Sequence, residues 1–102
     1  MEVLFNTDKE LVRKYGPQQA RKVQLRLGFL KAAENLGQVP VTPPTRRHEL
    51  SDDRKGQFAV EINHPQRLTF EPDHNPLPRK PDGGIDLKKI TVIKIIGVED
   101  YH

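Results

Sequence analysis

The sequence predicts a small α+β domain in which an N-terminal helical hairpin packs against a β-sheet. Helix-starting motifs and apolar residues at helical spacing are confined to the first third of the chain, before a proline-rich stretch at 38–45. Short apolar segments of alternating pattern, typical of strands, follow that stretch. With 102 residues, 34% of them hydrophobic, the chain can build one modest core and has no room for a second. We therefore expect one domain over residues 1–102.

The first part of the chain predicts a short strand followed by two helices. Val3-Leu4-Phe5 is a brief apolar run, and Thr7-Asp8-Lys9-Glu10 has the spacing of a capping box, which starts a helix that should end at Gly16. Pro17 suits the first turn of a second helix, which should run to about Asn35. The two helices are expected to form a hairpin.

The second predicted helix carries two apolar rows rather than one. One row is formed by Ala20, Val23, Leu27 and Leu30, and the other by Leu25, Phe29, Ala32 and Leu36. A helix that is apolar on two sides is normally covered on both. We expect the sheet to cover one row, and the first helix or a partner protein to cover the other.

Prolines and glycines divide the remaining chain into strands and loops. Strands are predicted at 47–50, 57–62, 67–71 and 90–98, and a long loop at 72–86. The last strand is the most apolar and should lie in the middle of the sheet. Alternation predicts that Arg67 and Thr69 face away from the core. The same alternation gives a buried face formed by Phe58, Val60, Ile62, Leu68 and Phe70.

Composition narrows the class of protein. The chain has no cysteine, so disulfides and thiolate metal sites are excluded. It has no apolar run long enough to span a bilayer and no signal-peptide pattern at its start, so we expect a cytoplasmic protein without membrane contact. The net charge of +3 permits a nucleic-acid partner without requiring one. Basic residues gather in the middle of the chain, at Arg46, Arg47, Arg54, Lys55 and Arg67.

Most ordinary catalytic arrangements are missing. No pair of histidines has metal-ligand spacing, the single serine Ser51 lies in a turn, and no glycine-rich phosphate loop is present. We therefore expect no metal and no small-molecule cofactor. His64 and His74 lie in predicted loops and are expected to be solvated, whereas His48 lies in a strand beside basic residues.

The remaining polar residues suit cleavage of RNA through its own 2′-hydroxyl. That reaction needs a base for the hydroxyl proton, a cation for the charge on phosphate and an acid for the leaving oxygen. The candidates are His48, Arg67 and His102, supported by Tyr101 and Asp100. Each candidate has an alternative without a catalytic role. His48 is then a buried structural histidine, Arg67 a solvated strand residue, and residues 100–102 a solvated cluster.

Three segments carry a resemblance to a known family. RHELSDDRKGQFAV at 47–60, RLTF at 67–70 and VEDYH at 98–102 resemble the HigB branch of the RelE/ParE toxin superfamily, with 72–88 as an insertion. The resemblance implies two helices on a small twisted antiparallel sheet and metal-independent cleavage of messenger RNA on the ribosome. It also implies a HigA-like antitoxin with a helix-turn-helix domain, and a toxin that inhibits translation and arrests growth.

The resemblance also assigns residues. It places catalytic roles on His48, Arg67, Asp100, Tyr101 and His102, and RNA contacts on Arg47, Arg54 and Lys55. Gln66 departs from the family, which often has tryptophan there, and Gln57-Phe58 replaces a more aromatic pair. Fewer aromatic side chains mean less stacking on bases.

The last residue has a chemical environment of its own. The terminal carboxylate and Asp100 should both favour the charged imidazolium of His102, which suits a general acid and leaves His48 as the base. We expect His102 and its carboxylate to work as a unit at the end of the chain. Two other functions stay open at this point: a ParE-like gyrase inhibitor, and an RNA- or ribosome-binding regulator without catalysis.

Overall fold

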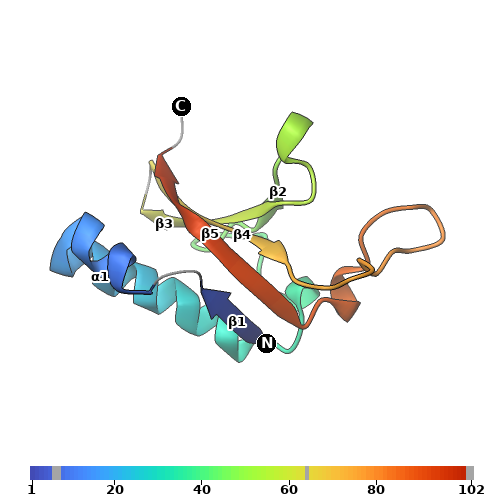
Figure 1. The fold of residues 1–102 in the computed structure, drawn as a ribbon, viewed down its shortest axis with the longest axis horizontal. Coiled ribbons are helices and arrows are strands. Elements are labelled where there is room, and N and C mark those ends of the chain that lie inside the picture. The colour runs from blue at the N-terminus through green and yellow to red at the C-terminus, as the bar shows by residue number, and fades with distance from the viewer. Residues whose placement is uncertain (6–7, 64, 101–102) are drawn as a thin grey trace.

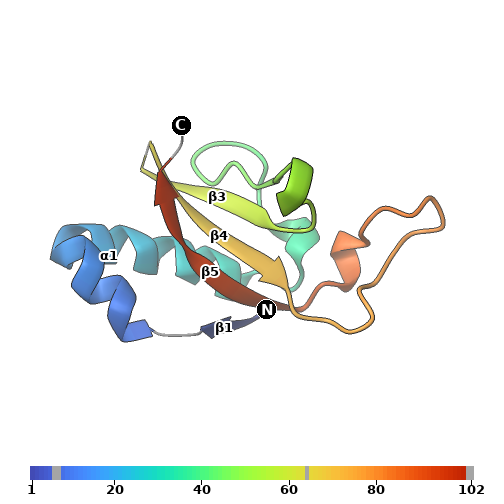
Figure 2. The ribbon, with the colours of Figure 1, turned by 45° about the horizontal axis from the view of Figure 1, so that its top comes forward.

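A computed structural model describes residues 1–5, 8–63 and 65–100, with the backbone alone for residues 8–17 and 19. One five-stranded sheet has the order β1-β5-β4-β3-β2. Its strands are β1 (Glu2–Phe5), β2 (His48–Glu49), β3 (Phe58–Asn63), β4 (Gln66–Pro72) and β5 (Val92–Asp100). The helix α1 (Asp8–Ala32) lies against one face (Figures 1 and 2). Three short 3-10 turns complete the fold: η1 (Leu36–Gln38), η2 (Asp52–Arg54) and η3 (Leu87–Lys89).

The predicted α+β class is confirmed, but the helical hairpin is wrong. A single helix runs from Asp8 to Ala32 and passes through Gly16 and Pro17, where a boundary was predicted. Figure 2 shows that the blue N-terminal part of α1 lies at an angle to the rest. An internal proline removes one backbone hydrogen bond and bends a helix, without ending it when the flanking residues favour helix.

The sheet is mixed rather than purely antiparallel. β1 pairs with β5 in parallel, and the other three pairs are antiparallel. β5 therefore has a neighbour on each side, as its apolar sequence predicts, although β4 occupies the centre.

The core lies between α1 and the sheet. Val23, Leu27 and Leu30 of the first apolar row are buried there, against the predicted inward face of β3 and β4. The second row is only partly exposed, because Leu25 is 62% and Phe29 is 49% exposed, whereas Leu36 is fully buried. The described residues form no second α-helix beside this row, so the predicted cover by a first helix is wrong.

A bulge in β5 determines which of its residues face the core. Thr69 pairs with Gly97 but Phe70 pairs with Ile95, so Ile96 is an extra residue without its own partner. The alternation of side chains shifts at this point. Val98 then continues the buried face, and Glu99 is turned to the opposite, open face of the sheet.

The predicted loop at 72–86 is an ordered projection. It stands off the end of the sheet and extends the long axis of the molecule (Figure 1). Its base is held by His74, whose Nε2 accepts hydrogen bonds from the amides of Thr91 and Val92 at 3.1 and 3.2 Å. The structure thus gives His74 a structural contact in place of the expected solvation.

No helix within the described ranges is both long and apolar enough to cross a bilayer.

Candidate functional site

The open face of the sheet carries two rows of aligned side chains. One row crosses three strands, because Glu61 pairs with Arg67 and Arg67 with Glu99. Residues directly opposite in antiparallel strands point to the same face, so these three charged side chains lie together. Arg67 therefore faces away from the core, as alternation predicts. The neighbouring row consists of His48, Ala59, Thr69 and Gly97.

Arg54 reaches this face from outside the sheet. Its Nη1 and Nη2 donate to Oε1 and Oε2 of Glu99 at 2.5 and 2.6 Å, which makes a two-bond ion pair. Its Nε donates to Oε1 of Gln57 at 2.9 Å, so the guanidinium is held on two edges. The turn that carries it returns to β3 through Gly56, whose φ of 97° favours glycine.

Glu99 is the centre of the network. Besides Arg54, its carboxylate lies 3.4 Å from Nη2 of Arg67 and 3.2 Å from the hydroxyl of Thr69, which also lies 3.1 Å from the carbonyl oxygen of Gly97. The hydrogen bond from Arg54 lowers the pKa of Glu99 from its ordinary 4.5 to about 2. The same hydrogen bond raises the pKa of Arg54. The pair is therefore fully ionised at neutral pH.

Arginines and carboxylates alternate on this face. Arg46 pairs with Glu61 at 3.4 Å, and Arg54 and Arg67 both lie beside Glu99. The charge of Asp53 also acts on Arg54. Side chains of Arg54 and Glu99 remain 32% and 30% exposed, which leaves the pair accessible to solutes. Guanidinium groups match phosphate and carboxylate in the same planar geometry. A phosphodiester therefore has a ready site here if it replaces the carboxylate beside Arg54.

His48 lies on the same face but at the edge of the sheet. It is half-buried opposite Ala59, and its Nδ1 is 3.1 Å from the carbonyl oxygen of Arg46. Two strand spacings, roughly 10 Å, separate its Cα from that of Thr69. His48 thus flanks the arginine network on the same face of the sheet.

Asp100 lies apart from this network. It pairs with Gln66, one position beyond Glu99, so strand alternation turns it to the other side of the sheet, where it is exposed. The other two predicted terminal site residues, Tyr101 and His102, fall outside the part of the chain that the structure describes.

Sequence reasoning missed the central role of Glu99. Simple alternation from Ile93 and Ile95 places Glu99 on the buried face, and the bulge at Ile96 reverses this placement. The one available signal is the pair Val98-Glu99 itself, because an apolar residue is expected inside and a carboxylate outside. The partner Arg54 is 45 positions away and has no local signal.

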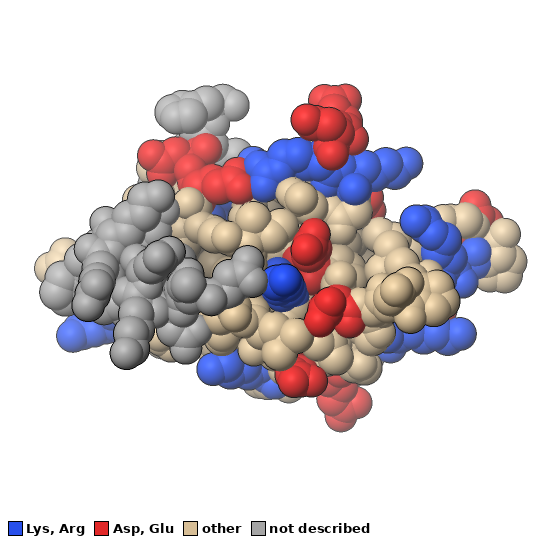
Figure 3. Space-filling model, viewed as in Figure 1, with Lys and Arg blue, Asp and Glu red and all other residues tan. Residues whose placement is uncertain are grey.

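The predicted RNA-contacting residues do not form one patch. Arg47 is half-buried and its Nε donates to the carbonyl oxygen of Val39 at 2.9 Å, while burial lowers its pKa. Arg54 is tied to Glu99, and Lys55 is exposed. Figure 3 shows basic side chains gathered between the C-terminal end of β5 and the η2 turn, with acidic groups at both ends. Among the described residues, no group of three or more histidines and carboxylates has the geometry to hold a metal ion.

Comparison with known proteins shows the fold. No protein-family model matches the sequence, and no curated protein is significantly similar to it. The structure is similar to a YoeB/ParE toxin from Agrobacterium tumefaciens, with a TM-score of 0.60, 11% identity and all of both chains covered. It is also similar to a YoeB-YefM complex from Staphylococcus aureus, with a TM-score of 0.59 and 17% identity over 100% of this chain and 97% of that one. A YoeB dimer from the same organism has a TM-score of 0.56 at the same identity and coverage.

Proposed function

We propose that this chain is the toxin of a bacterial type II toxin-antitoxin pair, of HigB-like type, that cleaves messenger RNA on the ribosome. The observation that carries the proposal is the convergence of Arg54 and Arg67 on Glu99, on the open face of a sheet. Two guanidinium groups around one oxyanion are what a phosphodiester needs as its charge grows during cleavage. The likeness in fold to YoeB-type toxins supports the same assignment.

The proposed chemistry uses the 2′-hydroxyl of the RNA as nucleophile. His48 takes the proton of that hydroxyl, Arg67 stabilises the charge on the phosphate oxygens, and His102 donates a proton to the leaving 5′-oxygen. Tyr101 supports the acid, whereas the predicted role of Asp100 is left out, because Asp100 is turned to the other side of the sheet. The 2′-oxygen forms a bond to phosphorus while the bond between phosphorus and the leaving 5′-oxygen breaks. The product therefore carries a 2′,3′-cyclic phosphate, and no metal takes part.

Glu99 has a defined part in this proposal. In the free protein it occupies the position beside Arg54 that the phosphate takes over. The Arg54–Glu99 pair contributes about 1–2 kcal/mol after solvent screening, and hydrogen bonds from Arg54 to a phosphate contribute about 1.5–3 kcal/mol each. Binding of the phosphate can therefore offset the loss of the pair.

The proposed partner is a HigA-like antitoxin with a helix-turn-helix domain. One of the similar structures is a YoeB-YefM toxin-antitoxin complex, which supports an antitoxin in general. The uncovered side chains of Leu25 and Phe29 on α1 offer an apolar surface for it. Co-expression of a short neighbouring reading frame should restore growth if that frame encodes the antitoxin.

Expression in bacteria tests the proposal. The unchanged chain should arrest growth and fragment messenger RNA, whereas the variants Arg67→Ala and His102→Ala should grow and leave it intact. Equal fragmentation by all three chains would remove the proposed site.

A gyrase-inhibiting function is the second candidate, because one similar structure carries the description YoeB/ParE. In that case DNA supercoiling by gyrase should fall on addition of the purified chain while messenger RNA stays intact. An RNA- or ribosome-binding regulator would leave both intact and still bind ribosomes.

A further inference from the structure

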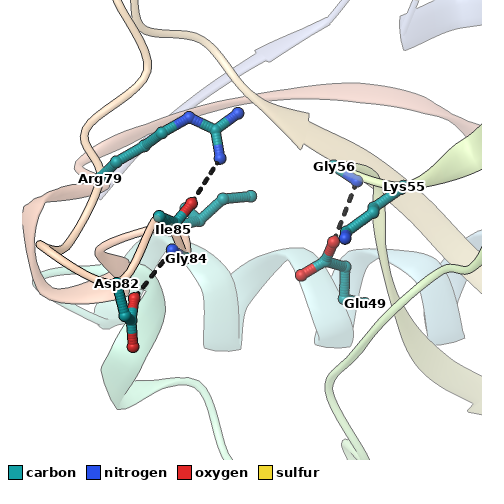
Figure 4. Close-up of a pocket in the computed structure, with 8 residues that line it drawn as sticks. Glu49, Lys55, Gly56, Arg79, Asp82, Gly84 and Ile85 are labelled. Carbon is teal, nitrogen blue, oxygen red and sulfur yellow. Dashed lines mark hydrogen bonds between the residues drawn. The ribbon is translucent and has the colours of Figure 1, made fainter.

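A groove of about 520 Å³ lies between the η2 turn and the tip of the projecting loop, away from the arginine network. Figure 4 shows Glu49 and Lys55 on one side and Arg79 and Asp82 on the other. The long side chains of Lys55 and Arg79 extend into the space between the two sides. The insertion thus supplies one wall of a groove whose other wall belongs to the sheet edge.

The loop that forms one wall of the groove is closed by hydrogen bonds. The amide of Lys80 donates to the carbonyl of Gly84 at 2.7 Å, and that of Gly83 donates to the carbonyl of Lys80 at 2.9 Å, which closes a tight hairpin. Nη1 of Arg79 donates to the carbonyl of Gly83 at 2.8 Å. Leu77 and Ile85 at the base of this hairpin pack against the core, whereas its tip at 80–84 is exposed and accessible to a ligand.

The charged side chains of the groove differ in the hydrogen bonds that they already make. Oε2 of Glu49 accepts the amide of Gly56 at 3.1 Å, and Oδ1 of Asp82 accepts the amide of Gly84 at 2.8 Å, so both carboxylates stabilise their own turns. Within the described part of the chain, the Lys55 ammonium has no carboxylate at ion-pair distance, and Arg79 uses one donor of its guanidinium on Gly83. The cations therefore have donors to offer a ligand.

The groove is connected to the arginine network through one turn. Arg54 and Lys55 are consecutive, yet Arg54 reaches Glu99 on the open face while Lys55 lines the groove. Because Lys55 follows Arg54 in the chain and lines the groove together with Arg79, the groove begins one residue from the network. Asp52 and Asp53, exposed on the same turn, oppose the binding of an anionic strand there.

We propose that this groove holds the RNA strand adjoining the cleaved phosphate, with Lys55 and Arg79 as ligands of the next phosphodiesters. This proposal rests on the proposed function, since it continues the path of the same RNA. The second oxygens of Glu49 and Asp82 accept hydrogen bonds from ribose 2′-hydroxyls, the group that distinguishes RNA from DNA. The insertion is then an RNA-binding arm that selects RNA over DNA.

The test measures binding of a single-stranded RNA oligonucleotide without ribosomes, by fluorescence anisotropy at several salt concentrations. The double variant Lys55→Ala with Arg79→Ala should bind about tenfold or more weakly, and each lost phosphate contact should reduce the salt slope by about 0.7. The pair Lys80→Ala with Lys88→Ala is the matched control, because it also removes two positive charges, both from exposed side chains of the insertion outside the groove lining. It should bind nearly as the unchanged chain does.

Three comparisons complete the design. Equal thermal unfolding midpoints of all variants exclude unfolding as the cause of weaker binding. The variant Arg79→Lys, with Lys55 unchanged, should have the salt slope of the unchanged chain. DNA of the same sequence should bind more weakly than RNA to the unchanged chain, and the double variant should narrow this difference.

The outcomes separate this proposal from the nuclease. If ribosomal messenger RNA is cut but the double variant binds free RNA with the affinity and salt slope of the control, the groove proposal falls and the nuclease stands. If nothing is cut but the double variant loses RNA binding selectively, the groove stands and the nuclease falls. Equal loss of RNA and DNA binding would overturn the selection of RNA.

Discussion

Arg54 and Glu99 are 45 positions apart in the chain and form an ion pair of two hydrogen bonds, at 2.5 and 2.6 Å, over the open face of the sheet. The pair connects the η2 turn to the end of β5. It also leaves a carboxylate in the place where a phosphate ligand of Arg54 and Arg67 would lie. Under the proposed function, stability and phosphate binding at this face depend on the same carboxylate.

Acidification should weaken the fold through Glu99. Its pKa falls from 4.5 to about 2 in the folded chain, so the pair stabilises the protein above about pH 4.5 and this contribution is lost as the pH falls towards 2. With solvent screening, we expect about 1–2 kcal/mol. Urea unfolding should show Glu99→Gln less stable than the unchanged chain at pH 5 and nearly equal to it at pH 2. A constant difference at both pH values, or one matched by the exposed Glu2→Gln, would contradict the assignment.

Neutralising Glu99 should strengthen RNA binding. The Glu99→Gln variant keeps the size of the side chain but removes the charge that competes with phosphate for Arg54. We expect affinity for a free RNA oligonucleotide to rise about three- to tenfold, the equivalent of about 1 kcal/mol. Arg54→Ala should bind more weakly than the unchanged chain in the same titration. Weaker binding by Glu99→Gln would mean that the carboxylate positions the arginines instead of competing with phosphate.

His74 should stabilise the start of β5. Replacement by alanine leaves the amides of Thr91 and Val92 without their side-chain acceptor, which should cost about 1 kcal/mol in the free energy of unfolding. Hydrogen exchange of the Val92 amide should quicken in His74→Ala and stay slow in Asn75→Ala, a change at the exposed next residue. Unchanged exchange at Val92 would show that the contact contributes nothing.

The exposed row of α1 should matter for the antitoxin and not for the fold. Leu25 is 62% and Phe29 is 49% exposed, so Leu25→Glu with Phe29→Glu should lower the free energy of unfolding by no more than about 1 kcal/mol. By contrast, Leu27→Ala on the buried row should cost about 2–5 kcal/mol. Co-purification with the proposed antitoxin should be lost in the double glutamate variant. A complex that survives would place the antitoxin elsewhere.

Local patterns were sufficient to predict most of the sheet. Alternation in β3 and β4 places Phe58 and Phe70 inside and Arg67 on the open face, because burial of one face fixes the register of a strand. The helix boundary predicted at Pro17 was wrong. A proline favours the start or end of a helix, but the turns of α1 on both sides of Pro17 continue the helix.

The candidate site was harder to predict because its geometry is not local. Arg67 was identified from the sequence. The position of Glu99 on the open face depends on the bulge in β5, and the role of Arg54 depends on its contact with Glu99 across three strands. Lys55 was identified as basic, but the groove it lines needs Arg79 from an insertion that composition describes only as a loop. Tyr101 and His102 stay predictions from the sequence.

The most direct test of the whole account is to map cuts in messenger RNA on translating ribosomes with purified chains. Arg67→Ala should cut at least about a hundredfold more slowly than the unchanged chain, because a cation at the reacting phosphate is lost. Arg21→Ala, which removes an exposed arginine from α1 on the other side of the sheet, should cut at the normal rate. Equal rates for Arg67→Ala and Arg21→Ala, or no cuts by the unchanged chain, would contradict the proposed nuclease.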